Sequence, residues 1–230
     1  MQMSHMNFSH KNKTNSNLGF WSALFTAAAN LWFFIAFIPY QPTWNAPWTG
    51  MAAFAASFHP ASFLAWAVPE FAFAIFFVTM MTCVHITAGE EKKTWSQLAL
   101  VFAMLYAAIL IPLYYFYITV VPYHIVNGTT DGLALWLHAY YYPHNIFGAM
   151  EGAGYLMMSM SFLLASLIFD QGKLQLWVRW TFVGTGVCTL GLFLNPLFPL
   201  PLALSLVTAI GGAVLGILAP LLLAILFRRK

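Results

Sequence analysis

Six long apolar stretches constrain the fold of this chain more than any other feature of its sequence. They cover residues 18–40, 61–86, 95–120, 145–169, 174–194 and 201–227. A helix that crosses the roughly 30 Å hydrocarbon core of a bilayer needs about 20 apolar residues, and each stretch meets that length. Only 7% of the residues are charged, whereas about 25% are charged in a soluble domain. We therefore predict an all-α integral membrane bundle of six transmembrane helices.

The basic residues predict how this bundle is oriented. Six spans place all nine Lys and Arg residues on the same side of the membrane, whereas five or seven spans would scatter them. They are Lys11, Lys13, Lys92, Lys93, Lys173, Arg179, Arg228, Arg229 and Lys230. Cytoplasmic loops carry the excess of Lys and Arg in membrane proteins. Both termini are therefore predicted to be cytoplasmic.

The same reading gives a simple domain organisation. Residues 1–17 form a polar cytoplasmic tail, and residues 18–230 form a single transmembrane domain. The net charge of +3 is too small to favour nucleic-acid binding. Cys83 and Cys188 fall at depths that differ by roughly 13 Å, so we expect two free thiols rather than a disulfide. The expected surroundings are the lipid bilayer and either a homo-oligomer or a larger membrane complex.

Two acidic residues, Glu70 and Glu151, lie inside predicted spans. A charged side chain at the centre of a bilayer costs about 2.5–3.5 kcal/mol even on the more lenient scale, so such residues usually face the bundle interior and mark a site. Glu70 lies roughly 13 Å and Glu151 roughly 9 Å below the outer membrane surface. We expect them to share a site in which one can donate a proton. The alternative is that each forms only structural hydrogen bonds between helices.

Polar and aromatic residues surround both glutamates in the predicted helices. Trp66 precedes Glu70 by four residues and Tyr155 follows Glu151 by four, so each aromatic residue shares a helix face with its glutamate. Asn30, near the middle of the first stretch, is a further polar group that needs a partner. A pocket with carboxyl, aromatic and amide groups suits a small amphipathic or cationic ligand.

The two long outer loops, 41–60 and 121–144, are rich in aromatic residues and histidines. An aromatic belt at the headgroup level is one interpretation, and a lid over a site is the other. We expect His138 and His144 to contribute to ligand binding, and we place His124 in the second of these loops. The spacing of His138 and His144 does not match a helical zinc motif. We therefore predict no metal site and no cofactor.

Two segments resemble an uncharacterised family of small multi-helix bacterial membrane proteins. They are residues 141–159, YYPHNIFGAMEGAGYLMMS, and residues 85–93, HITAGEEKK. In that family a Tyr/Asn-Pro-His segment leads into a helix with a Glu followed by Gly-Tyr. The matching residues here are His144, Glu151 and Tyr155. The resemblance implies a fold and a bacterial inner membrane, but no reaction. The helix count and the placement of the termini are also similar to the substrate-binding subunits of energy-coupling-factor vitamin transporters.

Three functions remain open at this point. The first is binding or transport of a small, partly apolar or cationic ligand in an outward-facing intramembrane pocket. The second is a membrane-embedded acid–base enzyme that acts on a lipid or isoprenoid. The third is an accessory subunit of a membrane complex.

Overall fold

The computed structural model describes residues 2–40, 48–137, 145–194, 197–198 and 200–229, with the backbone alone for 2–14 and 38–40. The described residues form helices and connecting turns without a strand, which confirms the all-α prediction. The long helices are α1 (Gln2–Tyr40), α3 (Pro60–Thr87), α4 (Lys93–Val126), α5 (Ile146–Ser166), α6 (Gly172–Leu194) and α7 (Leu202–Arg228). The short elements are α2 (Met51–Ala56), η1 (Glu90–Lys92) and η2 (Leu133–Trp136).

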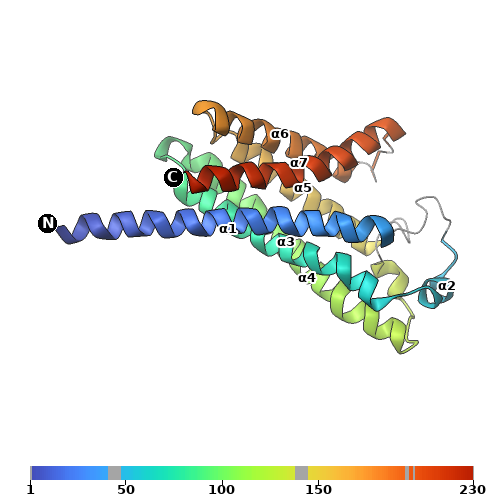
Figure 1. Ribbon diagram of the computed structural model, residues 1–230. Helices are drawn as coiled ribbons and strands as arrows, with labels where there is room; N and C mark the ends of the chain where they lie inside the picture. The colour runs from blue at the N-terminus through green and yellow to red at the C-terminus, as the bar shows by residue number, and fades with distance from the viewer. Residues whose placement is uncertain (1, 41–47, 138–144, 195–196, 199, 230) are drawn as a thin grey trace.

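The six long helices pack as a closed ring. Each long helix contacts the long helices before and after it in the sequence, and α7 returns to contact α1. The two termini lie at the same end of the bundle (Figure 1). There, the Ser16 hydroxyl donates a hydrogen bond to the Phe227 carbonyl, and Gly19 packs against the Phe227 ring. An even number of antiparallel helices accounts for this arrangement.

Five helical segments among the described residues are long and apolar enough to span a membrane. They are Asn15–Phe37, Pro60–Thr87, Glu90–Val126, Gly172–Leu194 and Leu202–Arg228. Large apolar side chains on these helices are exposed on the outside of the ring, such as Trp32 at 62% and Ile35 at 64%. Such an apolar surface is suited to contact with lipid rather than with water. The sixth long helix, α5, has 21 residues.

The two ends of the bundle differ in charge. We call the end with the termini the basic end; its described cationic residues are Lys92, Lys93, Lys173, Arg179, Arg228 and Arg229. Lys92 forms an ion pair with Asp170, and this pair links the α3–α4 turn to the α5–α6 turn. The Arg228 guanidinium lies 5.5 Å from the ring centre of Phe20, which links α7 to α1. The opposite end, with α2 and η2, is the loop end.

The helix boundaries differ from the sequence-based ones in two places. The backbone is helical from Gln2 in α1, so most of the predicted polar tail continues the first helix. Helix α4 continues to Val126 with Pro112 and Pro122 inside it. The placement of His124 in a loop was therefore wrong, because it lies in the last turn of α4. Proline is tolerated inside membrane helices because neighbouring groups compensate for the lost backbone hydrogen bond.

Candidate functional site

Helices α3, α4 and α5 bring two carboxyl groups and three tyrosines together inside the bundle. Glu70 is 8% exposed and Glu151 is 6% exposed. The two carboxyl groups lie near enough to interact electrostatically, and both interact with tyrosines of α4. We call this group the Glu–Tyr cluster; it consists of Glu70, Tyr106, Tyr114, Glu151 and Tyr155.

Glu151 is held by two tyrosine hydroxyl groups. The Tyr114 hydroxyl donates a hydrogen bond of 2.8 Å to Oε1 of Glu151, from α4 to α5. The Tyr155 hydroxyl donates a longer one, 3.2 Å, to the same oxygen from one turn along α5. Because these donors come from two helices, they fix the orientation of the carboxyl group as well as its position.

Glu70 is buried without such support. Its carboxyl group makes no hydrogen bond with another residue in the described part of the chain, and neither does the hydroxyl of Tyr106 beside it, which is 1% exposed. The cluster therefore contains hydrogen-bonding capacity that a ligand or a water molecule can satisfy.

Local sequence features of α5 explain how Glu151 comes to face α4. The Asn145 side chain caps the helix, because its Oδ1 accepts a 2.6 Å hydrogen bond from the Gly148 N–H. This cap starts α5 at Ile146 and so places Glu151 in its second turn. Further along, a Cβ at Gly154 would lie 2.1 Å from the Leu110 side chain. The missing side chain lets α5 approach α4 closely enough for the bond between Tyr114 and Glu151.

A tightly packed group of aromatic rings covers the Glu–Tyr cluster on its loop-end side. We call it the loop-side aromatic cluster, and it consists of Phe63, Trp66, Tyr117 and Phe147. Ring centres lie 4.7 Å apart between Phe63 and Tyr117, and 5.4 Å apart between Trp66 and Tyr117. Phe147 of α5 closes the group at 4.4 Å from Tyr117. These four side chains are less than 2% exposed.

A second aromatic group lies on the basic-end side of the carboxyl groups and shares Tyr106 with the Glu–Tyr cluster. We call it the basic-side aromatic cluster, and it consists of Phe77, Tyr106, Phe162 and Phe182. Phe77 lies 5.4 Å from Tyr106 and 5.1 Å from Phe162 between ring centres. Phe162 lies 5.1 Å from Phe182 of α6. These side chains are also less than 2% exposed.

The helix register places the carboxyl groups between these two aromatic clusters. On α3, Trp66 precedes Glu70 by roughly 6 Å and Phe77 follows it by roughly 10 Å along the helix axis. On α5, Phe147 precedes Glu151 by one turn and Phe162 follows it by three. The carboxyl groups are thus separated from both ends of the bundle by packed rings.

The residues expected at the site from the sequence have different locations. Tyr155 contacts Glu151 directly, and Trp66 lies in the loop-side aromatic cluster. Asn30 lies at the contact between α1 and α7, where a Cβ at Gly216 would come within 2.6 Å of its Nδ2. His138 and His144 fall outside the described residues.

Sequence reasoning missed Tyr106 and Tyr114, although their spacing carries a signal. Every buried residue in the middle of α4 belongs to one stripe that repeats with the helical period, and the two tyrosines lie in that stripe. A polar-tipped side chain in a buried stripe needs a partner, and a glutamate in a neighbouring span is an obvious acceptor.

Comparison of the chain with protein-family models, with curated proteins and with solved structures finds no match. Within the described residues, no group of three or more His, Cys, Asp or Glu side chains has the arrangement of a metal site. The chemistry of the candidate site therefore has to be derived from its two carboxyl groups and the rings around them.

Proposed function

We propose that this chain is a multi-pass membrane protein that binds a small, partly apolar cation between Glu70 and Glu151 and carries it across the membrane. The observation that carries the proposal is that two buried carboxyl groups lie close enough inside the helix bundle to interact electrostatically. An ionisable residue within a membrane span marks a ligand or ion pathway by default, because its burial is costly. Two such residues close together raise that cost, which a bound cation would offset.

The charge distribution favours a cation over an anion. The described Lys and Arg residues lie at the basic end, so none of them neutralises the two carboxyl groups from within the cluster. The walls of the site are aromatic, and the faces of Tyr, Trp and Phe rings attract organic cations. Two carboxyl groups and these rings suit an amine or a quaternary ammonium group better than a metal ion, which requires more oxygen or nitrogen ligands.

The two aromatic clusters favour transport over simple surface binding. A receptor that is open to one face of the membrane has a closed floor beneath its ligand but needs no barrier above it. Here packed rings separate the carboxyl groups from both ends, as in an occluded state between two access states. In this proposal the loop-side aromatic cluster opens to one face of the membrane and the basic-side aromatic cluster opens to the other.

We also propose that all six long helices span the membrane, with a defined orientation. Helix α5 is the sixth span, and the basic end faces the cytoplasm, because Lys and Arg are concentrated in cytoplasmic loops. Both termini are then cytoplasmic, and the loop end faces outward. The resemblance of residues 85–93 and 141–159 to a family of bacterial membrane proteins supports a bacterial inner membrane.

A thermal unfolding experiment on the protein in lipid nanodiscs tests the function. The probes are tetramethyl-, tetraethyl- and tetrabutylammonium, with an alkyl sulfonate and a neutral alcohol of matched size as controls. A ligand that binds only the folded state at 100 times its Kd stabilises that state by about 2.7 kcal/mol. We expect at least one cation to raise the melting temperature, and neither the sulfonate nor the alcohol to do so.

Substitutions of the two glutamates test whether the rise in melting temperature comes from binding at the proposed site. Glu70→Gln and Glu151→Gln should each abolish the shift, whereas Glu91→Gln, at an exposed glutamate of η1, should leave it unchanged. If the wild type does not respond, or if both site variants respond like the wild type, the proposed site is wrong. Conversion of a lipid extract by the wild type but not by Glu151→Gln would replace transport with catalysis.

A further inference from the structure

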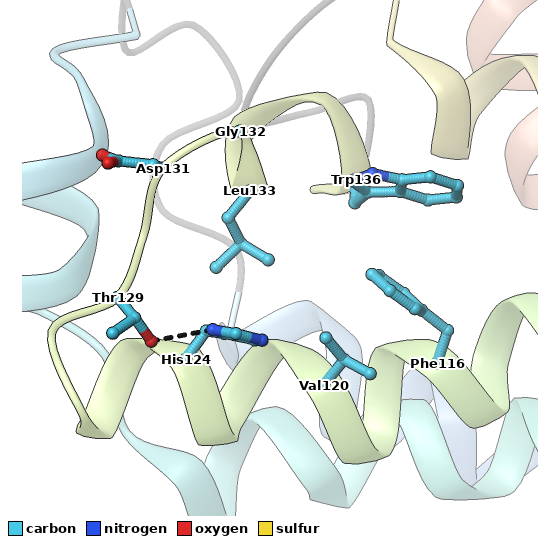
Figure 2. Close-up of a pocket in the computed structure, with 8 residues that line it drawn as sticks. All are labelled: Phe116, Val120, His124, Thr129, Asp131, Gly132, Leu133 and Trp136. Atoms are coloured by element: carbon cyan, nitrogen blue, oxygen red, sulfur yellow. Dashed lines mark hydrogen bonds between the residues drawn. The ribbon is translucent and has the colours of Figure 1, made fainter.

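A separate pocket lies at the loop end, where the chain folds back over the last turns of α4. Its volume is about 300 Å³. Figure 2 shows the pocket between the α4 helix below and the η2 segment above. The lining residues are Phe116, Val120, His124, Thr129, Asp131, Gly132, Leu133 and Trp136. None of them belongs to the Glu–Tyr cluster.

A reversal of the backbone creates this pocket. Gly128 and Gly132 adopt φ angles of 69° and 75°, in the left-handed region that favours glycine. The Thr129 N–H donates a 2.9 Å hydrogen bond to the His124 carbonyl, which closes the turn after α4. The returning segment then lies over the helix, and its Leu133 is only 5% exposed.

One part of the pocket is apolar. Phe116 and Val120 lie one turn apart on the same face of α4. The Phe116 and Trp136 rings have centres 4.7 Å apart, and they face each other at one end of the pocket (Figure 2). Leu133 points from the opposite wall toward α4. A hydrocarbon group fits between these walls.

The other part of the pocket contains a hydrogen-bonded pair of side chains, His124 and Thr129. The Nδ1 of His124 lies 2.8 Å from the Thr129 hydroxyl oxygen. The ring extends along α4 so that its second nitrogen points toward Val120 (Figure 2), and this Nε2 makes no hydrogen bond with a described residue. When the Thr129 hydroxyl donates to Nδ1, Nε2 carries the proton and can donate. The Asp131 carboxylate points away from the pocket.

We infer that this pocket binds one hydrocarbon chain whose end carries an oxygen acceptor, with that oxygen on Nε2 of His124. The span Glu90–Val126 has 37 residues and is therefore longer than the roughly 30 Å hydrocarbon core of a bilayer. Its last turns, which line the pocket, then extend from the hydrocarbon into the headgroup region in the proposed arrangement. Amphiphilic molecules concentrate at this depth, with their hydrocarbon toward the centre of the bilayer and their polar group toward water. The pocket has the same order, because its apolar part lies deeper along α4 than His124 does. A free fatty acid supplies the oxygen as a carboxylate, and a phospholipid supplies it as an ester or phosphate.

Native mass spectrometry of the delipidated protein tests this inference, with oleate and dioleoyl phosphatidylglycerol as separate probes. We expect saturable binding of one molecule of at least one probe. Val120→Trp fills the pocket and should weaken that binding at least tenfold. Val126→Trp is the matched control, because Val126 lies on the same helix, is 70% exposed and does not line the pocket. Binding of oleate alone assigns the site to fatty acids, and binding of the phospholipid assigns it to membrane lipid.

A second variant keeps the test decisive if Val120→Trp fails to fold. His124→Phe preserves an aromatic ring but removes the hydrogen bond, and it should weaken binding several-fold in the same assay. The inference is overturned if neither probe binds saturably to the wild type. It is also overturned if Val120→Trp and His124→Phe bind as tightly as Val126→Trp.

Discussion

The Tyr114 hydroxyl donates a 2.8 Å hydrogen bond to Oε1 of Glu151, and this bond joins α4 to α5 inside the bundle. Tyr155 donates to the same oxygen from within α5, at 3.2 Å. The first bond holds two helices together, whereas the second acts within one helix. The two bonds should therefore contribute differently to stability.

Tyr114→Phe should lower the free energy of unfolding by about 1 kcal/mol, within the range found for hydrogen bonds between membrane helices. Tyr155→Phe should lower it by less, because its bond is longer and local to α5. Reversible unfolding in mixed micelles measures both values. Equal losses in the two variants would contradict the view that the bond between α4 and α5 is the stronger one.

Glu70→Gln should raise the melting temperature of the protein without ligand. Glu70 is buried and has no hydrogen-bond partner among the described residues, and an amide costs less to bury than a carboxylate. Residues retained for function at a cost in stability show this behaviour. A lower melting temperature for Glu70→Gln, measured in nanodiscs, would mean that its carboxyl group stabilises the fold.

Gly154→Ala should destabilise the bundle by about 1–2 kcal/mol, because overpacking in a close-packed interior costs about that much. The new Cβ would lie 2.1 Å from Cδ2 of Leu110, which is 1% exposed, so the Leu110 side chain would have to move within a packed interface. Gly152→Ala is the control on the same helix, since a Cβ there meets nothing within 4 Å. That variant should be neutral or more stable, because alanine favours a helix over glycine by about 0.5–1 kcal/mol. Unfolding in mixed micelles compares the two; similar effects would show that α5 does not need the close approach.

The ion pair between Lys92 and Asp170 should make stability depend on pH at the basic end. The Lys92 hydrogen bond holds the pKa of the Asp170 carboxyl group below its usual range. A lowered folded-state pKa contributes stability above the unfolded-state pKa of about 3.9, and that contribution is lost as pH falls through the folded-state pKa.

Asp170→Asn should therefore melt at a lower temperature than the wild type at neutral pH, and the difference should shrink below about pH 4. It should also shrink in 1 M salt, because the pair is exposed. Asp131→Asn, at an exposed aspartate of the loop end, is the control. A difference between Asp170→Asn and the wild type that does not change from pH 7 to pH 3 would contradict this role of the pair.

The sequence predicts where the helices of this protein lie better than it predicts which side chains contact one another between them. Apolar length gives the long helices to within a few residues at most ends, because hydrocarbon thickness sets that length. It also draws attention to Glu70 and Glu151, because a carboxyl group inside a span is costly. It does not identify Tyr114 as the donor to Glu151, since that contact depends on how closely α5 approaches α4. Likewise, His124 was assigned to a loop because the apolar stretch was ended at residue 120, whereas α4 continues to Val126.

The central claim is that Glu70 and Glu151 hold one ligand together, and a double-mutant cycle on ligand affinity tests it most directly. Tetraethylammonium dissociation constants are measured for the wild type, Glu70→Gln, Glu151→Gln and the double variant by calorimetry in nanodiscs. Groups that share a ligand show coupling, so we expect each single variant to bind at least tenfold more weakly, with a coupling energy of about 1 kcal/mol or more. Single variants that bind as tightly as the wild type, or losses that add to within about 0.3 kcal/mol, would contradict a shared site.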